Sequence, residues 1–222
     1  MKFGEPFIIE GYMNSWPCFS KNDSNNRNWG NINYLKQIAG HRTVNIEIGK
    51  NYLDNNLSQK LITFNEFIEQ FIENNNETIG YLAQTKLLDQ IPELKKDIKI
   101  PEYCSEQPIV NAWFGPKNTI TPLHFDPKNN FLCQVVGYKY IKLYHSKYSN
   151  YLYPNSSSKL YFNTSMVDIE NPNYEKYQKF KEIEPNFLEC VLRPGDILFI
   201  PKLYYHFVKS LSISFSLSFW WG

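Results

Sequence analysis

Alternating apolar and polar positions dominate the second half of the chain. In LSISFSLSFWW (residues 211–221), the apolar residues at odd positions 211–219 share one face, and four serines and Trp220 share the other. Side chains on a strand alternate between its two faces, so this pattern predicts a strand. FLCQVV, KYIKLY and CVLRPGDILFIP predict further short strands. Many short strands at close spacing are typical of a β-sandwich or β-barrel.

The first half has a mixed pattern. PFIIEG and TVNIEIG predict strands, and NINYLKQIAG predicts a helix that ends at Gly40 in a left-handed cap. TFNEFIEQFIEN predicts a second helix, because Thr63 and Glu66 form a capping-box pair and four apolar residues follow helical spacing. The pattern changes near residue 105. We therefore predict one domain, 1–222, in which the mixed segment 1–104 packs on a β-barrel core formed by 105–222.

Two local features of the predicted barrel need interpretation. Gly137 and Tyr138 separate two strand segments, and two residues with glycine first predict a tight type II′ hairpin. The serine face of residues 211–221 has two interpretations. It can face water, as is common in antiparallel sheets, or it can face the barrel interior and leave room for a ligand. The large Trp220 on the same face favours the second interpretation.

Composition and charge exclude several classes of protein. The chain has 222 residues, 42% hydrophobic and 17% aromatic, with a net charge of +1, so no charge excess favours nucleic acid or a membrane surface. We expect no membrane-spanning segment, because no apolar run approaches about 20 residues. The beginning of the chain lacks an apolar signal-peptide core.

Four cysteines form no CxxC pair, which argues against a zinc ribbon or a disulfide framework. We therefore expect an intracellular protein, in the nucleus, the cytoplasm or both.

The candidate chemistry begins with the HFD motif at His124 and Asp126. Residues two apart on a strand project from the same face, about 6.5–7 Å apart along it, so both side chains can bind one metal ion. Of the remaining histidines, His206 has the best context, because it follows RPGDILFIPKLYY and begins another predicted strand. Two histidines and a carboxylate form the facial triad of non-haem iron(II) oxygenases, which leaves three adjacent coordination positions open. The alternative is a surface histidine followed by a turn-forming Asp-Pro pair.

Lys139 is a second candidate for a functional residue. In KYIKLY it shares a face with Ile141 and Leu143, which places it on the apolar side of its strand. A buried lysine is costly unless an anion pairs with it, so Lys139 is a candidate ligand for a carboxylate. The alternative is a lysine at a strand end whose ammonium group reaches out to water.

Long stretches of the chain resemble JmjC domains, in particular the short, hydroxylase-type group. The resemblance rests on NAWFGPKNTITPLHFDPKNNFLCQVVGYKYIKLY and LRPGDILFIPKLYYHFVKSLSISFSLSFWW, and it extends from EPFIIEG to the last residue. It implies a mostly β fold with flanking helices, a double-stranded β-helix of the cupin (jelly-roll) type, which holds Fe(II) and 2-oxoglutarate and uses O₂. His124, Asp126 and His206 match the iron ligands. The positions that match 2-oxoglutarate contacts or the pocket lining are Tyr81, Thr121, Asn130, Lys139, Trp113 and Trp220.

The same resemblance implies an oxidoreductase that acts on a protein or peptide. Hydroxylation of a protein side chain, with arginine favoured, is the expected reaction; histone lysine demethylation and a catalytically silent cupin-like interaction module are the alternatives. An arginine substrate needs a carboxylate partner. Glu47 is a weak candidate, since it faces away from Val44, Ile46 and Ile48, but we favour a solvent-exposed role for it. His41 and His145 match no ligand position. The sequence does not indicate an oligomeric state.

Overall fold

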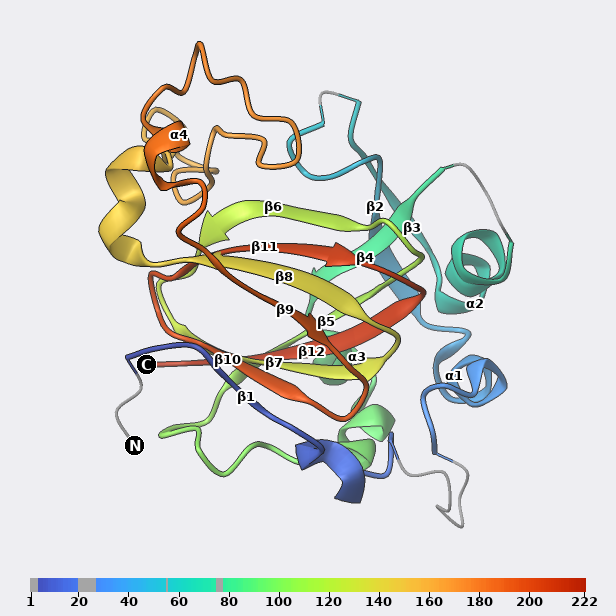
Figure 1. Ribbon diagram of the computed structural model, residues 1–222. Helices are drawn as coiled ribbons and strands as arrows, with labels where there is room; N and C mark the ends of the chain where they lie inside the picture. The colour runs from blue at the N-terminus through green and yellow to red at the C-terminus, as the bar shows by residue number, and fades with distance from the viewer. Residues whose placement is uncertain (1–3, 20–26, 55, 75–77) are drawn as a thin grey trace.

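Two antiparallel sheets face each other in the computed structural model, which describes residues 4–19, 27–54, 56–74 and 78–222. The eight-stranded sheet has the order β1-β10-β7-β12-β5-β4-β2-β3, and the four-stranded sheet has the order β6-β11-β8-β9 (Figure 1). The strands of the larger sheet are β1 Phe7–Ile9, β2 Thr43–Ile48, β3 Ser58–Thr63, β4 Gly80–Thr85, β5 Ile109–Gly115, β7 Asn129–Val136, β10 Ile197–Ile200 and β12 Ser214–Trp221. Those of the smaller sheet are β6 Ile120–Phe125, β8 Lys139–Tyr144, β9 Leu188–Leu192 and β11 Tyr205–Ser210.

The path of the chain between the sheets makes this a jelly roll. From β5 to β8, each successive strand joins the opposite sheet, and β9 to β12 do the same. Alternation of this kind winds the chain around a shared interior and produces two sheets packed face to face. The predicted fold class, a mostly β protein with a double-stranded β-helix and flanking helices, is confirmed.

Short helices lie outside the sheets. α1 and α2 lie beside the larger sheet (Figure 1), and α2 begins with the predicted capping box, in which Thr63 and Glu66 bond each other's backbone. The second half of that predicted helix is π-helical. The helical segments are η1 Tyr12–Ser15, α1 Ile32–Ala39, α2 Phe64–Phe67, η2 Ile68–Glu73, α3 Leu87–Gln90, η3 Pro92–Asp97, η4 Ser146–Tyr151 and α4 Phe180–Ile183. None of these described helices is long and apolar enough to cross a membrane.

The main hydrophobic core lies between the larger sheet and the N-terminal helices. Phe114 on β5 and Phe215 on β12 stack there, with ring centroids 4.6 Å apart. Phe215, Leu217 and Phe219 all belong to this core, so the apolar face of β12 points out of the barrel toward the helices. The alternate residues of β12, Ser214, Ser216 and Ser218, are also buried and face the barrel interior. The interior interpretation of the serine face is therefore correct.

Three local predictions fail. β7 and β8 do not form a hairpin, because β7 pairs with β10 and β12, whereas β8 pairs with β11 and β9. Gly137 has the positive φ (+73°) expected of a tight turn, but the turn leads from one sheet to the other. Gly40 is right-handed (φ −54°), not a left-handed cap. The last strand begins only at Ser214, which leaves Leu211 and Ile213 exposed before it.

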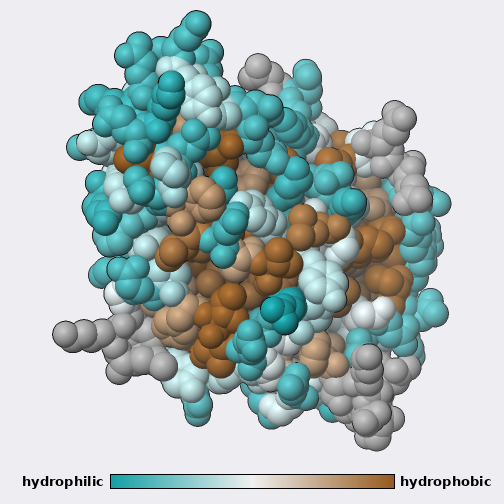
Figure 2. Space-filling view, in the orientation of Figure 1, coloured by the Kyte–Doolittle hydropathy of each residue, from teal (hydrophilic) through white to brown (hydrophobic). Residues whose placement is uncertain are grey.

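Two outer strands form part of the visible surface. Ile8 on β1 and Leu188 and Val191 on β9 are exposed, and apolar side chains emerge between polar ones over this region in Figure 2. β1 and β9 are edge strands of the two sheets. The barrel interior, by contrast, carries the polar residues that form the site described below.

Gly137→Ala is expected to lower the free energy of unfolding by about 3 kcal/mol, because an L-residue is strained at this φ and a methyl group collides with backbone. A Cβ atom at this position would lie 1.8 Å from the carbonyl oxygen of Ile213. Urea unfolding measures the change. Gly4→Ala is the matched control, since a Cβ there meets nothing within 4 Å. Equal stability of the two variants would contradict the close packing of the Gly137 turn against the backbone of Ile213.

Candidate metal centre

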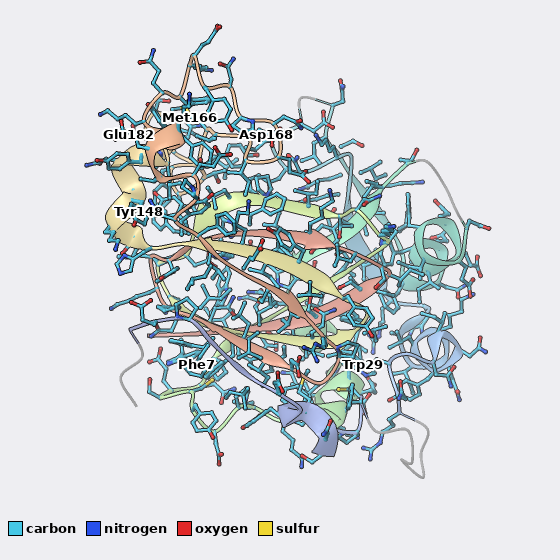
Figure 3. The ribbon with its side chains drawn as sticks, in the orientation of Figure 1. Phe7, Trp29, Tyr148, Met166, Asp168 and Glu182 are labelled. Atoms are coloured by element: carbon cyan, nitrogen blue, oxygen red, sulfur yellow. The ribbon has the colours of Figure 1, made fainter. Side chains whose placement is uncertain are left out.

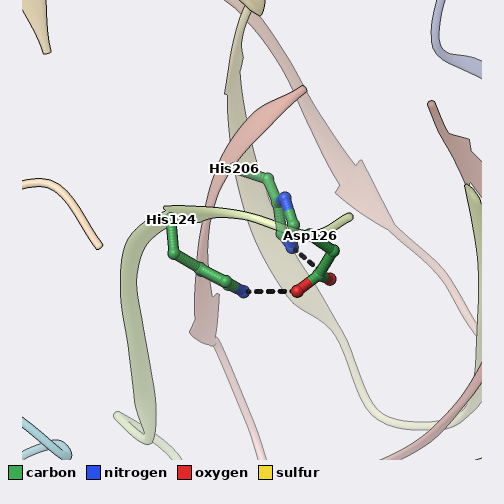
Figure 4. Close-up of side chains that lie close together, drawn as sticks. All are labelled: His124, Asp126 and His206. Atoms are coloured by element: carbon green, nitrogen blue, oxygen red, sulfur yellow. Dashed lines mark ion pairs between the residues drawn. The ribbon is translucent and has the colours of Figure 1, made fainter. Parts of the chain in front are cut away.

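Three side chains distant in the sequence meet in the barrel interior. His124, Asp126 and His206 each offer a ligand atom, and these atoms all lie within 4.8 Å of one another (Figure 4). Nε2 of His124 lies 3.8 Å from Oδ1 of Asp126, and Nε2 of His206 lies 3.6 Å from Oδ2. The two imidazole centroids are 4.1 Å apart. This is the only such group of three or more potential metal ligands among the described residues.

Strand pairing brings the two histidines together. β11 pairs antiparallel with β6, and His206 stands directly opposite His124. A register shift follows at once, between His206 and Val208, so the strands bulge beside the site. Asp126 lies just beyond the end of β6, where its carbonyl accepts a hydrogen bond from the N–H of Leu203 at 2.7 Å. The turn that precedes β11 therefore holds the third ligand in place.

Backbone carbonyls orient both imidazoles. Nδ1 of His124 lies 2.8 Å from the carbonyl of Pro122, and Nδ1 of His206 lies 3.1 Å from that of Tyr204. A carbonyl only accepts, so each Nδ1 carries the hydrogen and donates it. Each Nε2 then keeps its lone pair and points to Asp126. This tautomer is the one that binds metal, and the arrangement is typical of metal-ligating histidines.

The electrostatics of the triad favour a bound cation. Burial lowers the pKa of His206 well below its ordinary value, with His124 acting in the same direction, so His206 is neutral near pH 7. Burial also raises the pKa of Asp126, against the opposing effect of His124. A cation would relieve the cost of a buried carboxylate, and it needs neutral imidazole ligands.

All six residues predicted to bind or line the cosubstrate site share one pocket with the triad. Trp113 and Trp220 form part of its wall, with further apolar surface from Leu132 and Ile200. Ser218, which the sequence pattern did not single out, also lines it and accepts a hydrogen bond from Nε1 of Trp113 at 2.7 Å. The alternation of serines along β12 is the feature of the sequence that could have identified Ser218. The predicted residues in the pocket are Tyr81, Trp113, Thr121, Asn130, Lys139 and Trp220.

Lys139 is buried in this pocket without a counter-ion. Its Nζ donates to Oγ of Ser216 at 2.6 Å and to the hydroxyl of Tyr81 at 3.3 Å, and among the described residues no carboxylate pairs with it. Burial lowers the pKa of Lys139 to about 7. The alternative of an ammonium group that reaches water is thereby excluded. A buried cation with no anionic partner is a ready site for a carboxylate from a ligand.

Two further polar atoms of the pocket have no partner. Oδ1 of Asn130 and Nε1 of Trp220 are buried and form no hydrogen bond with any residue that the structure describes. Buried polar groups are nearly always satisfied, so an unpartnered acceptor and donor that share a pocket with the Lys139 ammonium group fit the binding of a polar ligand there. The residues present fit a divalent metal ion at the triad and an acid whose far carboxylate meets Lys139.

Glu47 lies nearer to this site than the sequence suggested. It pairs across β2 and β4 with Tyr81, and burial, with a smaller contribution from the Glu47 carboxylate, raises the pKa of the Tyr81 and Tyr52 hydroxyls. Burial raises the pKa of Glu47 itself. The expectation of a solvent-exposed role is therefore wrong, because the Glu47 side chain is half-buried and its strand partner Tyr81 lines the pocket.

Tyr52 is a residue that the sequence pattern did not reveal. Its hydroxyl lies 3.1 Å from Oγ1 of Thr164, its ring stacks on Tyr161, and Asp126 contributes to raising its pKa. It lies in a loop without periodicity, so no sequence signal marks it. The segment that carries Thr164 continues to Met166 and Asp168, above β6 in Figure 3. His41 is exposed and His145 caps η4, so neither belongs to the site.

Comparison with known proteins agrees with the fold and the triad. The cupin-like domain family matches residues 1–222. JmjC domain-containing protein D of Dictyostelium discoideum is 53% identical over 96% of this chain and 51% of its own length. Lysine-specific demethylase 8 of Danio rerio is 49% identical (98% of this chain, 53% of the relative), and lysine-specific demethylase JMJ30 of Arabidopsis thaliana is 45% identical (99% and 50%).

The chain thus spans about half the length of these curated relatives. The family match covers the two sheets, the triad and the lysine pocket together. From this match, and from the jelly-roll topology with its converging His-Asp-His side chains, we conclude that the chain belongs to the cupin-like family and is a JmjC-domain protein.

Proposed function

We propose that this chain is an Fe(II)- and 2-oxoglutarate-dependent oxygenase that hydroxylates a side chain of a protein substrate. One observation carries the proposal: a neutral-imidazole and carboxylate triad shares a pocket with a buried ammonium group that lacks a counter-ion. Three ligands on one side of a metal leave adjacent positions open for a chelating 2-oxo acid and O₂. The names of several relatives, which include lysine-specific demethylases, agree with oxidative chemistry on proteins.

The residues of the chain have distinct roles in this proposal. Nε2 of His124, a carboxylate oxygen of Asp126 and Nε2 of His206 would hold the metal. Bound iron with 2-oxoglutarate and O₂ would supply the oxidising chemistry, with succinate and CO₂ as products. The two backbone carbonyls at Nδ1 keep the histidines in the ligating tautomer throughout. No side chain has to transfer a proton.

The cosubstrate would be held at its far end by a cation. The free N–H of Lys139 and the hydroxyls of Tyr81 and Thr121 would bind the distal carboxylate, since charge-assisted hydrogen bonds are about twice as strong as neutral ones. Asn130, which lines the same pocket, would offer further polar groups to the cosubstrate. Trp220 lines the pocket, where its ring would help to limit water and so strengthen the electrostatic interactions inside.

Arginine is our favoured target residue. Glu47 is half-buried and pairs across β2 and β4 with Tyr81, a residue of the pocket. A carboxylate can bind the planar guanidinium through two parallel hydrogen bonds. The second candidate is demethylation of a methylated lysine, favoured by the names of the relatives. A cationic methylammonium group would meet the same carboxylate, so mass spectrometry must decide between a gained oxygen and a lost methyl group.

Purified chain with Fe(II) is expected to convert 2-oxoglutarate to succinate even without a protein substrate. His206→Ala should lower this turnover by more than about 100-fold, since it removes a metal ligand. His41→Ala, at an exposed position, should leave it unchanged. Succinate is measured by NMR and bound iron by its absorption in dialysed protein. A wild-type chain that neither binds iron nor forms succinate would instead support the silent interaction module.

The affinity for 2-oxoglutarate is expected to fall as the pH rises through 7. The distal carboxylate stabilises the protonated amine of Lys139, so binding raises its pKa above the value of about 7 in the free pocket. Above that pH the free amine must take up a proton on binding, and the dissociation constant should rise about tenfold between about pH 6.5 and pH 8. Calorimetric titration at each pH measures this. Lys139→Met should bind roughly 100-fold more weakly and lose this pH dependence; an unchanged slope in that variant would refute the assignment.

Glu47→Gln is expected to lower hydroxylation of the peptide substrate without changing the conversion of 2-oxoglutarate in the absence of peptide. The variant keeps the size of the side chain but loses the charge that would pair with guanidinium, so kcat/KM for an arginine-containing peptide should fall by about tenfold or more. Succinate formation without peptide should stay at the wild-type rate. Peptide hydroxylation by mass spectrometry and succinate by NMR are measured together. Equal peptide hydroxylation by the variant and the wild type would exclude Glu47 from substrate binding.

A further inference from the structure

We infer that Ser216 is a positioning residue that sets how far the Lys139 ammonium group projects into the pocket, and thereby selects the chain length of the 2-oxo diacid. The inference rests on the proposed function. It concerns a residue outside the pocket wall: Ser216 does not line the pocket, yet its Oγ lies 2.6 Å from Nζ of Lys139.

Ser216 is held rigidly. It is the third residue of β12, just after a register shift against β7, and it pairs on both sides, with Trp113 on β5 and Gln134 on β7. Its side chain is fully buried. A short side chain on a central strand has little freedom, so its hydroxyl is a fixed point inside the barrel.

Lys139, by contrast, has a long flexible side chain. It begins at the first residue of β8 in the four-stranded sheet, and its ammonium group reaches across the interior to Ser216 in the eight-stranded sheet. Four methylene groups allow many rotamers, and side-chain entropy opposes a single one. The bond to Ser216 is the shorter of its two hydrogen bonds, so this hydroxyl determines where the charge lies.

The donor count leaves one N–H for a ligand. A lysine ammonium group has three donors. Ser216 and Tyr81 accept two of them, and no other described residue accepts the third. With two donors committed to fixed acceptors, the direction of the third is determined. The fold therefore fixes the distance from this third donor to the triad. A fixed distance matches a 2-oxo diacid of one chain length.

The other serines on the same face have partners of their own. Ser214 accepts from Nε2 of Gln134 at 2.9 Å, and Ser218 accepts from Nε1 of Trp113 at 2.7 Å. Of these three serines, only Ser216 bonds the lysine. Ser214→Ala therefore removes an equally buried hydroxyl from the same strand without touching Lys139, and it is the matched control.

Loss of the Ser216 hydroxyl has two expected consequences. The ammonium group loses an acceptor, and the space vacated behind it lets the flexible side chain retract. A retracted charge lies farther from the metal, which weakens binding of a five-carbon 2-oxo diacid and favours a six-carbon one. Both consequences act through Lys139, and neither requires contact between Ser216 and the ligand.

The test is calorimetric titration of 2-oxoglutarate and 2-oxoadipate into the full chain loaded with Mn(II), which binds the triad without turnover. Ser216→Ala is expected to bind 2-oxoglutarate about tenfold more weakly, the loss of one hydrogen bond to a charged group. Its preference for 2-oxoglutarate over 2-oxoadipate should shrink by a similar factor. Ser214→Ala should match the wild type in both, and Ser216→Thr, which keeps the hydroxyl, should restore both. Steady-state kinetics should show the change in KM for 2-oxoglutarate with kcat nearly unchanged.

The outcomes separate this inference from the proposed function. If the wild type binds 2-oxoglutarate and Lys139→Met does not, but Ser216→Ala keeps the wild-type affinity and selectivity, the positioning role is wrong and the proposed function stands. If the wild type binds neither diacid, the proposed function fails and the inference fails with it. Thermal unfolding checks each variant. Should Ser216→Ala not fold, Ser216→Cys, similar in size with a weak acceptor, provides the same test.

Discussion

The antiparallel register between β6 and β11 is the constraint on which the site depends. It places His206 opposite His124, and Asp126, just beyond the end of β6, lies within 4.8 Å of both ligand nitrogens. A shift of one residue would send one imidazole to the opposite face of the sheet, because side chains on strands alternate. The Leu203 N–H bonded to the Asp126 carbonyl ties the same register to the third ligand. One strand pairing thus fixes all three metal ligands.

A second property of the interior is its uncompensated polarity. Within the part of the chain that the structure describes, Lys139 is buried without a counter-ion, and polar atoms of Asn130 and Trp220 lack partners. Such groups cost free energy in a folded protein. The apolar core outside the larger sheet, where Phe114 and Phe215 stack, supplies stability at a distance from the pocket. This separation lets the barrel interior serve ligand binding, while hydrophobic burial on the other face of the same strands holds the sheet together.

The two faces of β12 show how one strand serves both ligand binding and hydrophobic burial. Phe215 and its apolar neighbours pack against the N-terminal helices, and Ser216 and its polar neighbours face the pocket. Alternation made both faces visible in the sequence, although it left open whether the serines meet water or the interior. Buried serine hydroxyls that hold Lys139, Gln134 and Trp113 answer that question. Small side chains here leave space that larger residues would fill.

The sequence alone determined the strand periods, the capping box of α2 and the His-Asp pair, because these depend on neighbours a few residues apart. It placed Lys139 on the apolar face of its strand but left open whether the ammonium group meets the interior or water. Context in the sequence made His206 the best third ligand, and resemblance to JmjC domains supported that choice and added the other five pocket residues. Only the tertiary structure decided the rest. Gly137 has the backbone of a hairpin turn, yet its strands enter different sheets, since turn geometry does not specify which strands pair. Tyr52 and the burial of Glu47 likewise depend on a loop and a strand pairing that no local pattern encodes. Periodicity shows which way a side chain points; long-range packing alone shows what it meets there.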